Sequence, residues 1–248
     1  MLTTTNGLVL SERTVKENDK FVTLLSPDLG VFDVMVRGAK KLNSTSASST
    51  QLFCYASFCI EQKNGRSYLD SCRPINIFYS IRTDLAKLSL ASYLAEIIRF
   101  TVTEGQSARD VMRLMLNCLH FLTTDERSVE QVKSVFELRL MSEIGMLPDL
   151  LCCKSCCAYD AERMYFYPES GIFVCADCDR SGFEGTAIPM SRATLAAMRQ
   201  VVLSDFDKIF SFRINGASMK QLSRISEEFL LSQLGRSFKT LDFYKSVT

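Results

Sequence analysis

The chain has 248 residues, of which 47% are apolar and 23% are charged, and its formal net charge is +1. This composition is typical of a globular protein and excludes an intrinsically disordered chain. No apolar run approaches the roughly 20 residues that span a bilayer, and the first residues carry no secretory signal. We therefore expect a cytoplasmic protein with reduced cysteines. With so small a net charge, any site for a polyanion must be a local patch.

The first 80 residues read as short strands. Runs rich in β-branched and aromatic residues occur at 7–10, 20–25, 31–36, 52–62 and 67–72, with turn residues between them. Five short strands in so small a segment favour a closed barrel of the OB-fold type. We expect residues 1–80 to form this barrel.

Three basic residues, Arg37, Lys40 and Lys41, follow the third predicted strand and precede the serine-rich run 44–50. That run cannot bury apolar area, so we expect a mobile loop beside the barrel lip. Basic side chains at such a lip suit the phosphates of single-stranded DNA, although a solvated charged turn explains the same pattern equally well. Four aromatic residues are candidates for stacking on bases, and most of them fit the barrel core better: Phe32, Phe53, Tyr55 and Phe58.

From residue 81 the apolar period changes to about 3.6 residues. We predict helices over 84–103, from Ser107 to about residue 122, and from Ser128 to a stop at Gly145. Further helices are expected from Ser191 to residue 203 and from Ser218 to residue 234, with 205–214 left open between helix and strand. Successive amphipathic helices indicate a bundle, so residues 81–248 are expected to form a helical domain.

Two CxxC pairs interrupt this helical region. Cys153 and Cys156 are separated by eighteen residues from Cys175 and Cys178. This spacing is typical of a structural zinc site, in which four thiolates close a tetrahedron around one ion. We predict one Zn²⁺ per chain in an insertion at about 150–180. The alternative is four ordinary reduced cysteines.

The remaining cysteines are given other roles. Cys152 and Cys157 flank the first pair and are alternative ligands, but only the 153/156 pair has CxxC spacing. Four others lie in apolar surroundings and are predicted to be small core residues: Cys54, Cys59, Cys72 and Cys118.

The sequence lacks the common catalytic motifs. It contains no GxxxxGK[ST], GxGxxG, HExxH or GxSxG segment. Its one histidine, His120, lies among apolar residues and is predicted to be a helix-packing or surface residue. A closed metal site would leave no position for substrate. We therefore expect a binding protein and no enzyme activity.

Several segments together carry a likeness to one known family. They are 7–10, 19–25, 36–41, the long stretch 136–150 that runs into the first CxxC pair, 167–171, and 234–240. In these segments the chain resembles the bacterial DNA repair and recombination family RecO, and the likeness spans the whole chain. The resemblance implies an α+β protein in which a five-stranded OB-fold barrel precedes an α-helical domain that carries a four-cysteine zinc element.

The same resemblance implies a function. Such proteins are non-enzymatic recombination mediators in the response to DNA damage, cytoplasmic and nucleoid-associated. They bind single- and double-stranded DNA, anneal complementary strands, and with RecR help to load RecA onto DNA coated by single-strand-binding protein (SSB). Arg37, Lys40 and Lys41 match basic barrel residues that contact DNA in the family.

The chain departs from the family pattern at one position, and two other functions are alternatives to the mediator function. Cys157 occupies a position where the family often has glycine, which implies a strained turn or a different choice of ligands. An RNA-binding module built from an OB-fold and a zinc element would use the same parts. A protein–protein adaptor is the other alternative, and the small net charge favours it.

Overall fold

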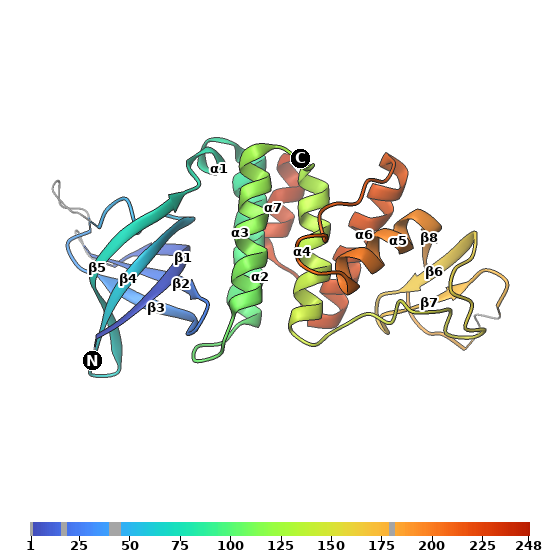
Figure 1. Ribbon diagram of the computed structural model, residues 1–248, viewed down its shortest axis with the longest axis horizontal. Coiled ribbons are helices and arrows are strands. Elements are labelled where there is room, and N and C mark those ends of the chain that lie inside the picture. Colours follow the sequence, from blue (N-terminus) through green and yellow to red (C-terminus); the bar gives the residue numbers. More distant parts are fainter. Residues whose placement is uncertain (1, 16–18, 40–45, 179–181) are drawn as a thin grey trace. The chain divides into compact units, whose positions relative to one another are not determined.

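The computed structural model describes residues 2–15, 19–39, 46–178 and 182–248 (Figure 1). The chain divides into two compact units, residues 1–123 together with 238–248, and residues 124–237. The C-terminal segment therefore belongs to the first unit. Among the described residues, no helix combines the length and apolar character needed to cross a membrane. The predicted domains, 1–80 and 81–248 with an insertion at about 150–180, stay predictions about independently folding parts.

The first unit contains the predicted barrel. Its strands are β1 (Leu2–Thr14), β2 (Lys20–Ser26), β3 (Gly30–Val36), β4 (Cys54–Lys63) and β5 (Arg66–Ile77). They close in the order β1-β2-β3-β5-β4, with β4 pairing back onto β1. Only the β3–β5 pair of this barrel is parallel. This five-stranded closed barrel confirms the predicted OB-type fold.

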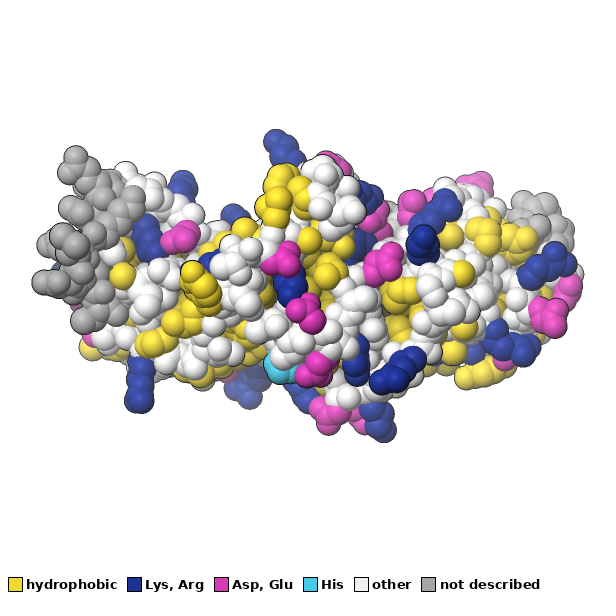
Figure 2. Space-filling model, turned by 90° about the horizontal axis from the view of Figure 1, so that it is seen from above, with side chains coloured by type: hydrophobic (Ala, Val, Ile, Leu, Met, Phe, Trp, Pro, Cys, Tyr) yellow, Lys and Arg dark blue, Asp and Glu magenta, His cyan; other side chains and the backbone are white. Residues whose placement is uncertain are grey.

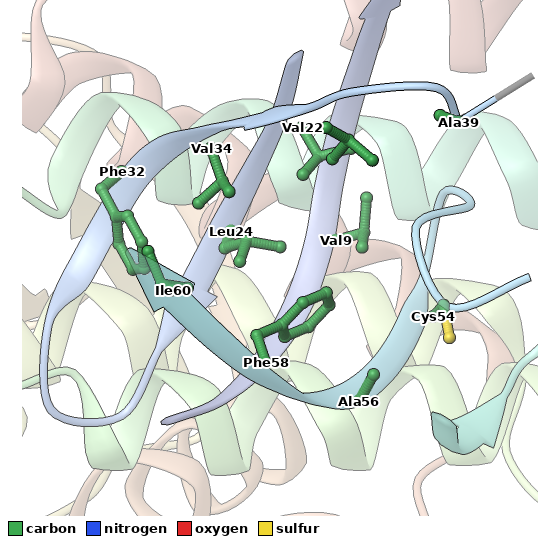
Figure 3. Packing of buried hydrophobic residues seen from close by; sticks show 11 residues of the cluster. Val9, Val22, Leu24, Phe32, Val34, Ala39, Cys54, Ala56, Phe58 and Ile60 are labelled. Atoms are coloured by element: carbon green, nitrogen blue, oxygen red, sulfur yellow. The ribbon is translucent and has the colours of Figure 1, made fainter. Parts of the chain in front are cut away.

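Alternation along each strand builds the barrel core. In β2, Val22 and Leu24 are fully buried, whereas the intervening Thr23 is partly exposed. Figure 3 shows that Val22 and Leu24 point into the barrel interior, where Val34 of the neighbouring β3 and Phe58 of β4 also lie. Burying a Val, Leu or Phe side chain contributes about 1.5–3 kcal/mol, so this interior is the main source of barrel stability.

Irregular strand pairing helps the sheet to close. Register shifts occur in β1 between Val9 and Ser11, and between β4 and β5 at Cys59 and Ile60. Bulges of this kind bend a strand and increase its twist, which a small barrel requires.

Four helices complete the first unit: α1 (Tyr79–Thr83), α2 (Leu85–Thr101), α3 (Arg109–Thr124, whose last residue lies past the boundary) and α7 (Lys239–Val247). The Asp84 carboxylate caps α2 by accepting from the Lys87 amide at 3.1 Å. Before α7, the buried Phe238 ring packs edge-on against Tyr93, with centroids 5.9 Å apart. This contact joins the end of the chain to α2.

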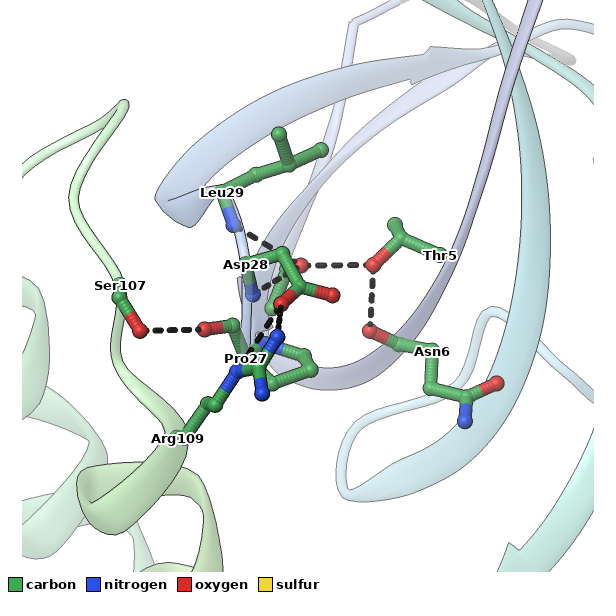
Figure 4. A network of polar contacts seen from close by, with 8 residues as sticks. Thr5, Asn6, Pro27, Asp28, Leu29, Ser107 and Arg109 are labelled. Carbon is green, nitrogen blue, oxygen red and sulfur yellow. Dashed lines mark hydrogen bonds and ion pairs between the residues drawn. The ribbon is translucent and has the colours of Figure 1, made fainter.

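A polar network ties the β2–β3 turn to the first residue of α3 and to the segment before this helix (Figure 4). Arg109 Nη2 lies 2.6 Å from Asp28 Oδ1, and the Ser107 hydroxyl donates to the Pro27 carbonyl oxygen. The approach is so close that a Cβ at Gly30 would lie 2.1 Å from the Thr103 carbonyl oxygen. Gly30 also has φ of +70°, so both its conformation and its surroundings require glycine.

The second unit combines helices with a small sheet. Its elements are α4 (Val129–Glu143), β6 (Arg163–Tyr167), β7 (Ile172–Cys175), β8 (Ile188–Ser191), α5 (Arg192–Leu203) and α6 (Gly216–Leu234). The antiparallel sheet has the order β7-β6-β8. The predicted caps Ser128 and Ser191 are confirmed, since each hydroxyl accepts an amide at 3.2 Å.

Two predictions in this unit need correction. The last long helix begins at Gly216, and its cap is Asn215, whose side chain accepts from the Ser218 amide at 2.8 Å. Asparagine caps a helix as well as serine does, so the earlier residue takes the position. Residues 205–214 form a turn and irregular chain, neither helix nor strand.

Candidate metal centre and nucleic-acid interface

Four cysteine thiols meet in the second unit. Cys153 and Cys156 lie in the loop between α4 and β6, Cys175 ends β7, and Cys178 lies in the turn after it. Their sulfur atoms all lie within 4.8 Å of one another. These are the four residues that the two CxxC pairs predict.

The spacing of the sulfurs fits a tetrahedral ion. Cys153 Sγ lies 3.9 Å from Cys178 Sγ, Cys156 Sγ lies 3.7 Å from Cys175 Sγ, and the Cys175 and Cys178 sulfurs are 3.3 Å apart. Thiolates about 2.3 Å from a zinc ion at the centre of a tetrahedron lie about 3.8 Å from each other. A disulfide needs about 2.05 Å between sulfurs, so these contacts are between free thiols.

The backbone around Cys153 favours its ionised form. The Cys175 amide donates to Cys153 Sγ at 3.3 Å. Burial opposes ionisation of this thiol, but hydrogen bonds from the backbone of Cys156, Cys175 and Ser155 outweigh it and lower its pKa to about 6. By contrast, the neighbouring Cys175 thiol is the main reason why the pKa of Cys178 is raised. A divalent ion would compensate this crowding, because bound thiols are deprotonated.

Cys152 and Cys157 lie outside this four-sulfur cluster. Burial and the neighbouring Cys157 thiol raise the pKa of the Cys152 thiol. Cys157 has φ of +59°, the left-handed conformation that favours glycine. The strained turn that the sequence implies at Cys157 is therefore present. The thiols that cluster are nevertheless those of the two CxxC pairs, 153/156 and 175/178.

Arg199 of α5 is hydrogen-bonded to the loop between α4 and β6, which carries Cys153 and Cys156. Its Nε donates to the Leu150 carbonyl oxygen at 2.7 Å, and its Nη2 donates to those of Leu151 and Tyr159. Its Cζ also lies 3.8 Å from the centroid of the Tyr159 ring. This arginine, one of several basic residues scattered through the C-terminal third, is therefore a structural residue of the loop.

The candidate nucleic-acid interface is on the barrel. Arg37 directly follows β3, is exposed, and places its Cζ 4.6 Å from the centroid of the Tyr68 ring. Lys40 and Lys41, the other two predicted DNA contacts, lie outside the described residues. Their role and that of Arg37 stay predictions.

The outer face of the barrel carries a row of side chains, of which the sequence interpretation singled out only Arg37. The register pairs Arg13 with Phe21, Phe21 with Met35, and Met35 with Tyr68, across β1, β2, β3 and β5. The Arg13 guanidinium lies 5.5 Å from the centroid of the Phe21 ring. We call Arg13, Phe21, Met35, Tyr68 and Arg37 the barrel-face row.

A groove lies beside one end of this row. Its volume is about 510 Å³, and its lining residues are Ser11, Glu12, Arg13, Phe21, Thr23, Asp33 and Arg99. Two arginines and one aromatic ring therefore border it, along with two carboxylates. Such a surface offers both phosphate contacts and a stacking platform.

The aromatic residues first considered for stacking are mostly core residues, as expected. Phe32, Phe53 and Phe58 are buried, and only Tyr55 is partly exposed. The signal for Phe21 was present in the alternation of β2, where inward Val22 and Leu24 leave Phe21 facing outward. Its alignment with Tyr68 depends on the pairing of strands, which the sequence did not reveal.

On the face in Figure 2, Lys and Arg side chains are interspersed with Asp and Glu. This agrees with a polyanion site that is local. His120 is exposed on α3 beside the Phe121 ring, at 5.4 Å between centroids. It is a surface residue, one of the two roles predicted for it.

Comparison with known proteins matches both parts of the chain. The family models described as Recombination protein O N terminal and C terminal match residues 1–78 and 82–242. DNA repair protein RecO of Acetivibrio thermocellus is 30% identical and covers 98% of this chain and 96% of its own. That of Alkaliphilus metalliredigens is 26% identical over 100% of both, and that of a Thermoanaerobacter species is 28% identical over 98% and 97%. These matches confirm the resemblance drawn from the sequence segments.

Proposed function

This chain belongs to the RecO family of DNA repair proteins, and on that premise we propose that it is a non-enzymatic recombination mediator. It binds single- and double-stranded DNA and anneals complementary strands. With RecR, it helps RecA to replace single-strand-binding protein, and it does so in the cytoplasm, at the nucleoid. The observation that carries this proposal is the barrel-face row, in which two arginines flank two aromatic rings.

The row suits a single strand because it offers two kinds of contact. Guanidinium groups of Arg13 and Arg37 attract phosphates without reading sequence. The rings of Phe21 and Tyr68 provide faces on which any base can stack, which is worth about 1–3 kcal/mol per base. Sequence-independent binding is what a protein needs in order to bring arbitrary complementary strands together.

Annealing by this route needs no catalytic group. The free energy comes from the base pairs that form, and the protein lowers the repulsion between two phosphate backbones. This agrees with the lack of a phosphate-binding loop motif in the sequence. Cys153, Cys156, Cys175 and Cys178 would hold a structural Zn²⁺, which would brace the hairpin of the second unit and leave no open position for substrate.

An adaptor that leaves all DNA contact to its partners is the alternative. It is favoured by the formal net charge of +1 and the interspersed charges. The two functions differ in what the isolated protein does.

Fluorescent complementary oligonucleotides distinguish them. We expect the purified chain to accelerate annealing without nucleotide, and its affinity for single strands to fall as salt rises. An adaptor would give no annealing and no DNA binding even at low salt. A strong preference for structured RNA would instead favour the RNA-binding module. Either result would overturn the proposal.

A further inference from the structure

A second, polar pocket lies where the β1–β2 pair ends, at the pairing of Thr14 with Lys20. Its volume is about 380 Å³, and all its lining residues belong to the first unit: Glu12, Thr14, Lys20, Ala39, Ala47, Gln51 and Arg82. It is distinct from the barrel-face row, with which it shares no residue. Among the described residues, the charged groups in its lining are one carboxylate and two cations.

Lys20 is fixed in this pocket by two contacts. Its Nζ lies 2.7 Å from Glu12 Oε2 and donates at 2.7 Å to the Thr50 carbonyl oxygen. Its side chain is only 10% exposed. The pair with Glu12 neutralises one positive charge, and the third ammonium proton has no acceptor among the described residues.

Arg82 of α1 is the second cation of the pocket. The one carboxylate among the described lining residues, Glu12, is paired with Lys20 and not with Arg82. Its Nη1 donates to Gln51 Oε1 at 2.5 Å, and its Cζ lies 5.6 Å from the centroid of the Tyr79 ring. Its Nε and Nη2 are buried and have no hydrogen-bond partner among the described residues. Buried donors without acceptors are rare and costly in folded proteins, especially on a charged group.

The two Arg82 nitrogens without hydrogen-bond partners indicate that the pocket suits an oxyanion. One edge of a guanidinium presents Nε–H and an Nη–H side by side, in the geometry that binds two oxygens of one oxyanion. With Glu12 paired to Lys20, the lining residues that the structure describes keep one net positive charge. The spare ammonium proton of Lys20 adds a third donor, and a phosphate group, whose oxygens project in tetrahedral directions, can accept it beside the two from Arg82.

We propose that this pocket binds a phosphate group of a DNA strand, with Arg82 as its bidentate receptor and Lys20 as a second donor. Because Arg82 Nε and Nη2 are closed to solvent in the unbound protein, binding includes a shift of the groups that cover them. The assignment of DNA as the source rests on the proposed function. The phosphate is either a terminal 5′-phosphate or an internal phosphodiester. In either case Arg82 adds a fixed anchor point to the adaptable contacts of the barrel-face row.

The Arg82 Nε resonance in a protein labelled with ¹⁵N-arginine reports on this pocket directly. Inorganic phosphate is the first probe, with chloride at equal ionic strength as its control. We expect phosphate to shift the Arg82 signal, identified by its loss in Arg82→Gln, and chloride to leave it unchanged. An Arg82 signal that does not move with phosphate overturns the site, whether or not the protein binds DNA.

Oligonucleotides with and without a 5′-phosphate then identify the source. We expect Arg82→Gln, and to a smaller extent Arg82→Lys, to weaken single-strand binding about tenfold, as expected for a lost charge-assisted contact. Arg73→Gln is the matched control, because it removes the same charge from an exposed position on β5 outside the pocket. A loss confined to the 5′-phosphorylated strand assigns a terminal phosphate, and an equal loss on both strands assigns a phosphodiester.

The outcomes separate this inference from the proposed function. If the wild-type protein binds DNA and Arg82→Gln binds it equally well, the pocket assignment is wrong and the mediator proposal stands. If the wild-type protein binds no DNA at all, the mediator proposal fails, and the assignment of DNA to this pocket fails with it. Circular dichroism of Arg82→Gln confirms that the variant is folded before either comparison is made.

Discussion

Lys133 Nζ lies 2.9 Å from Glu137 Oε1, one turn further along α4, and both side chains are buried. Glu227 of α6 lies 3.0 Å from the same ammonium, and the Ser226 hydroxyl donates to Glu137 Oε2 at 2.6 Å. Burying ions is costly unless each is paired and hydrogen-bonded, and here each is. This network therefore fixes how α4 and α6 pack within the second unit.

Removing the cation from this network should be strongly destabilising. Lys133→Met leaves Glu137 buried without its counter-ion, so we expect a loss of about 3–5 kcal/mol in the free energy of unfolding. Urea denaturation followed by circular dichroism measures it. The matched control is Lys133→Met/Glu137→Leu, which removes both ions and should recover much of the loss. A single variant as stable as wild type would show that the network contributes nothing.

The same network predicts a loss of stability at alkaline pH. Burial opposes the charge on Lys133, but the Glu137 and Glu227 carboxylates outweigh burial and raise its pKa above the ordinary 10.5. A lysine whose pKa is raised on folding stabilises the protein below the unfolded value, and this contribution is lost as pH rises through the folded value. We therefore expect the unfolding midpoint of wild type to fall above about pH 10.5. The decline should be smaller in Lys133→Met/Glu137→Leu, and equal slopes would contradict the assignment.

The packing of this network shows which features a sequence can predict. The strands of the barrel and the caps Ser128 and Ser191 follow from local alternation and side-chain chemistry, and both were predicted. The i, i+4 pair of Lys133 and Glu137 is visible in the sequence, but such pairs usually lie on a solvated helix surface. Their burial depends on α6, about 90 residues away, as the Ser226 contact shows.

The candidate sites also differ in whether the sequence alone could predict them. The cysteine cluster is encoded by spacing within two short turns, so it could be located from the sequence alone. The alignment of Phe21 with Tyr68 and the unsatisfied edge of Arg82 arise from strand register and tertiary packing. The short strand β8 was not predicted for a different reason. Its four residues include Pro189, and a proline within a short run argues against a strand.

The metal prediction is one zinc ion per chain. Metal analysis of the purified protein should give about one equivalent, and Cys153→Ser/Cys175→Ser should lose it together with the order of the β6–β7 hairpin. Cys152→Ser/Cys157→Ser is the matched control, because it removes two thiols from the same loop outside the cluster, and it should keep the ion. A metal-free chain with full stability would rule out a structural role.

Cys157 offers a separate test of the ligand set. Its φ of +59° costs about 1–2 kcal/mol for a residue with a Cβ, and glycine avoids that cost. We expect Cys157→Gly to retain zinc and to unfold with a free energy up to about 1 kcal/mol higher, because glycine's greater entropy in the unfolded chain offsets part of the gain. Loss of zinc from this variant would identify Cys157 as a ligand and refute the four-thiol assignment.

If the barrel-face row binds DNA, its aromatic rings and its arginines should contribute to the affinity in different ways. Phe21→Ala and Tyr68→Ala should each weaken single-strand binding by about 1–3 kcal/mol at all salt concentrations, because stacking does not depend on counterion release. Arg37→Ala should instead lower the slope of affinity against salt by about one, the signature of a lost phosphate contact. Phe243→Ala is the matched control, since this residue is 51% exposed and belongs to α7, not to a barrel strand. If the two barrel variants bind DNA as Phe243→Ala does, the row is not a stacking platform, and DNA binding must be assigned to another surface.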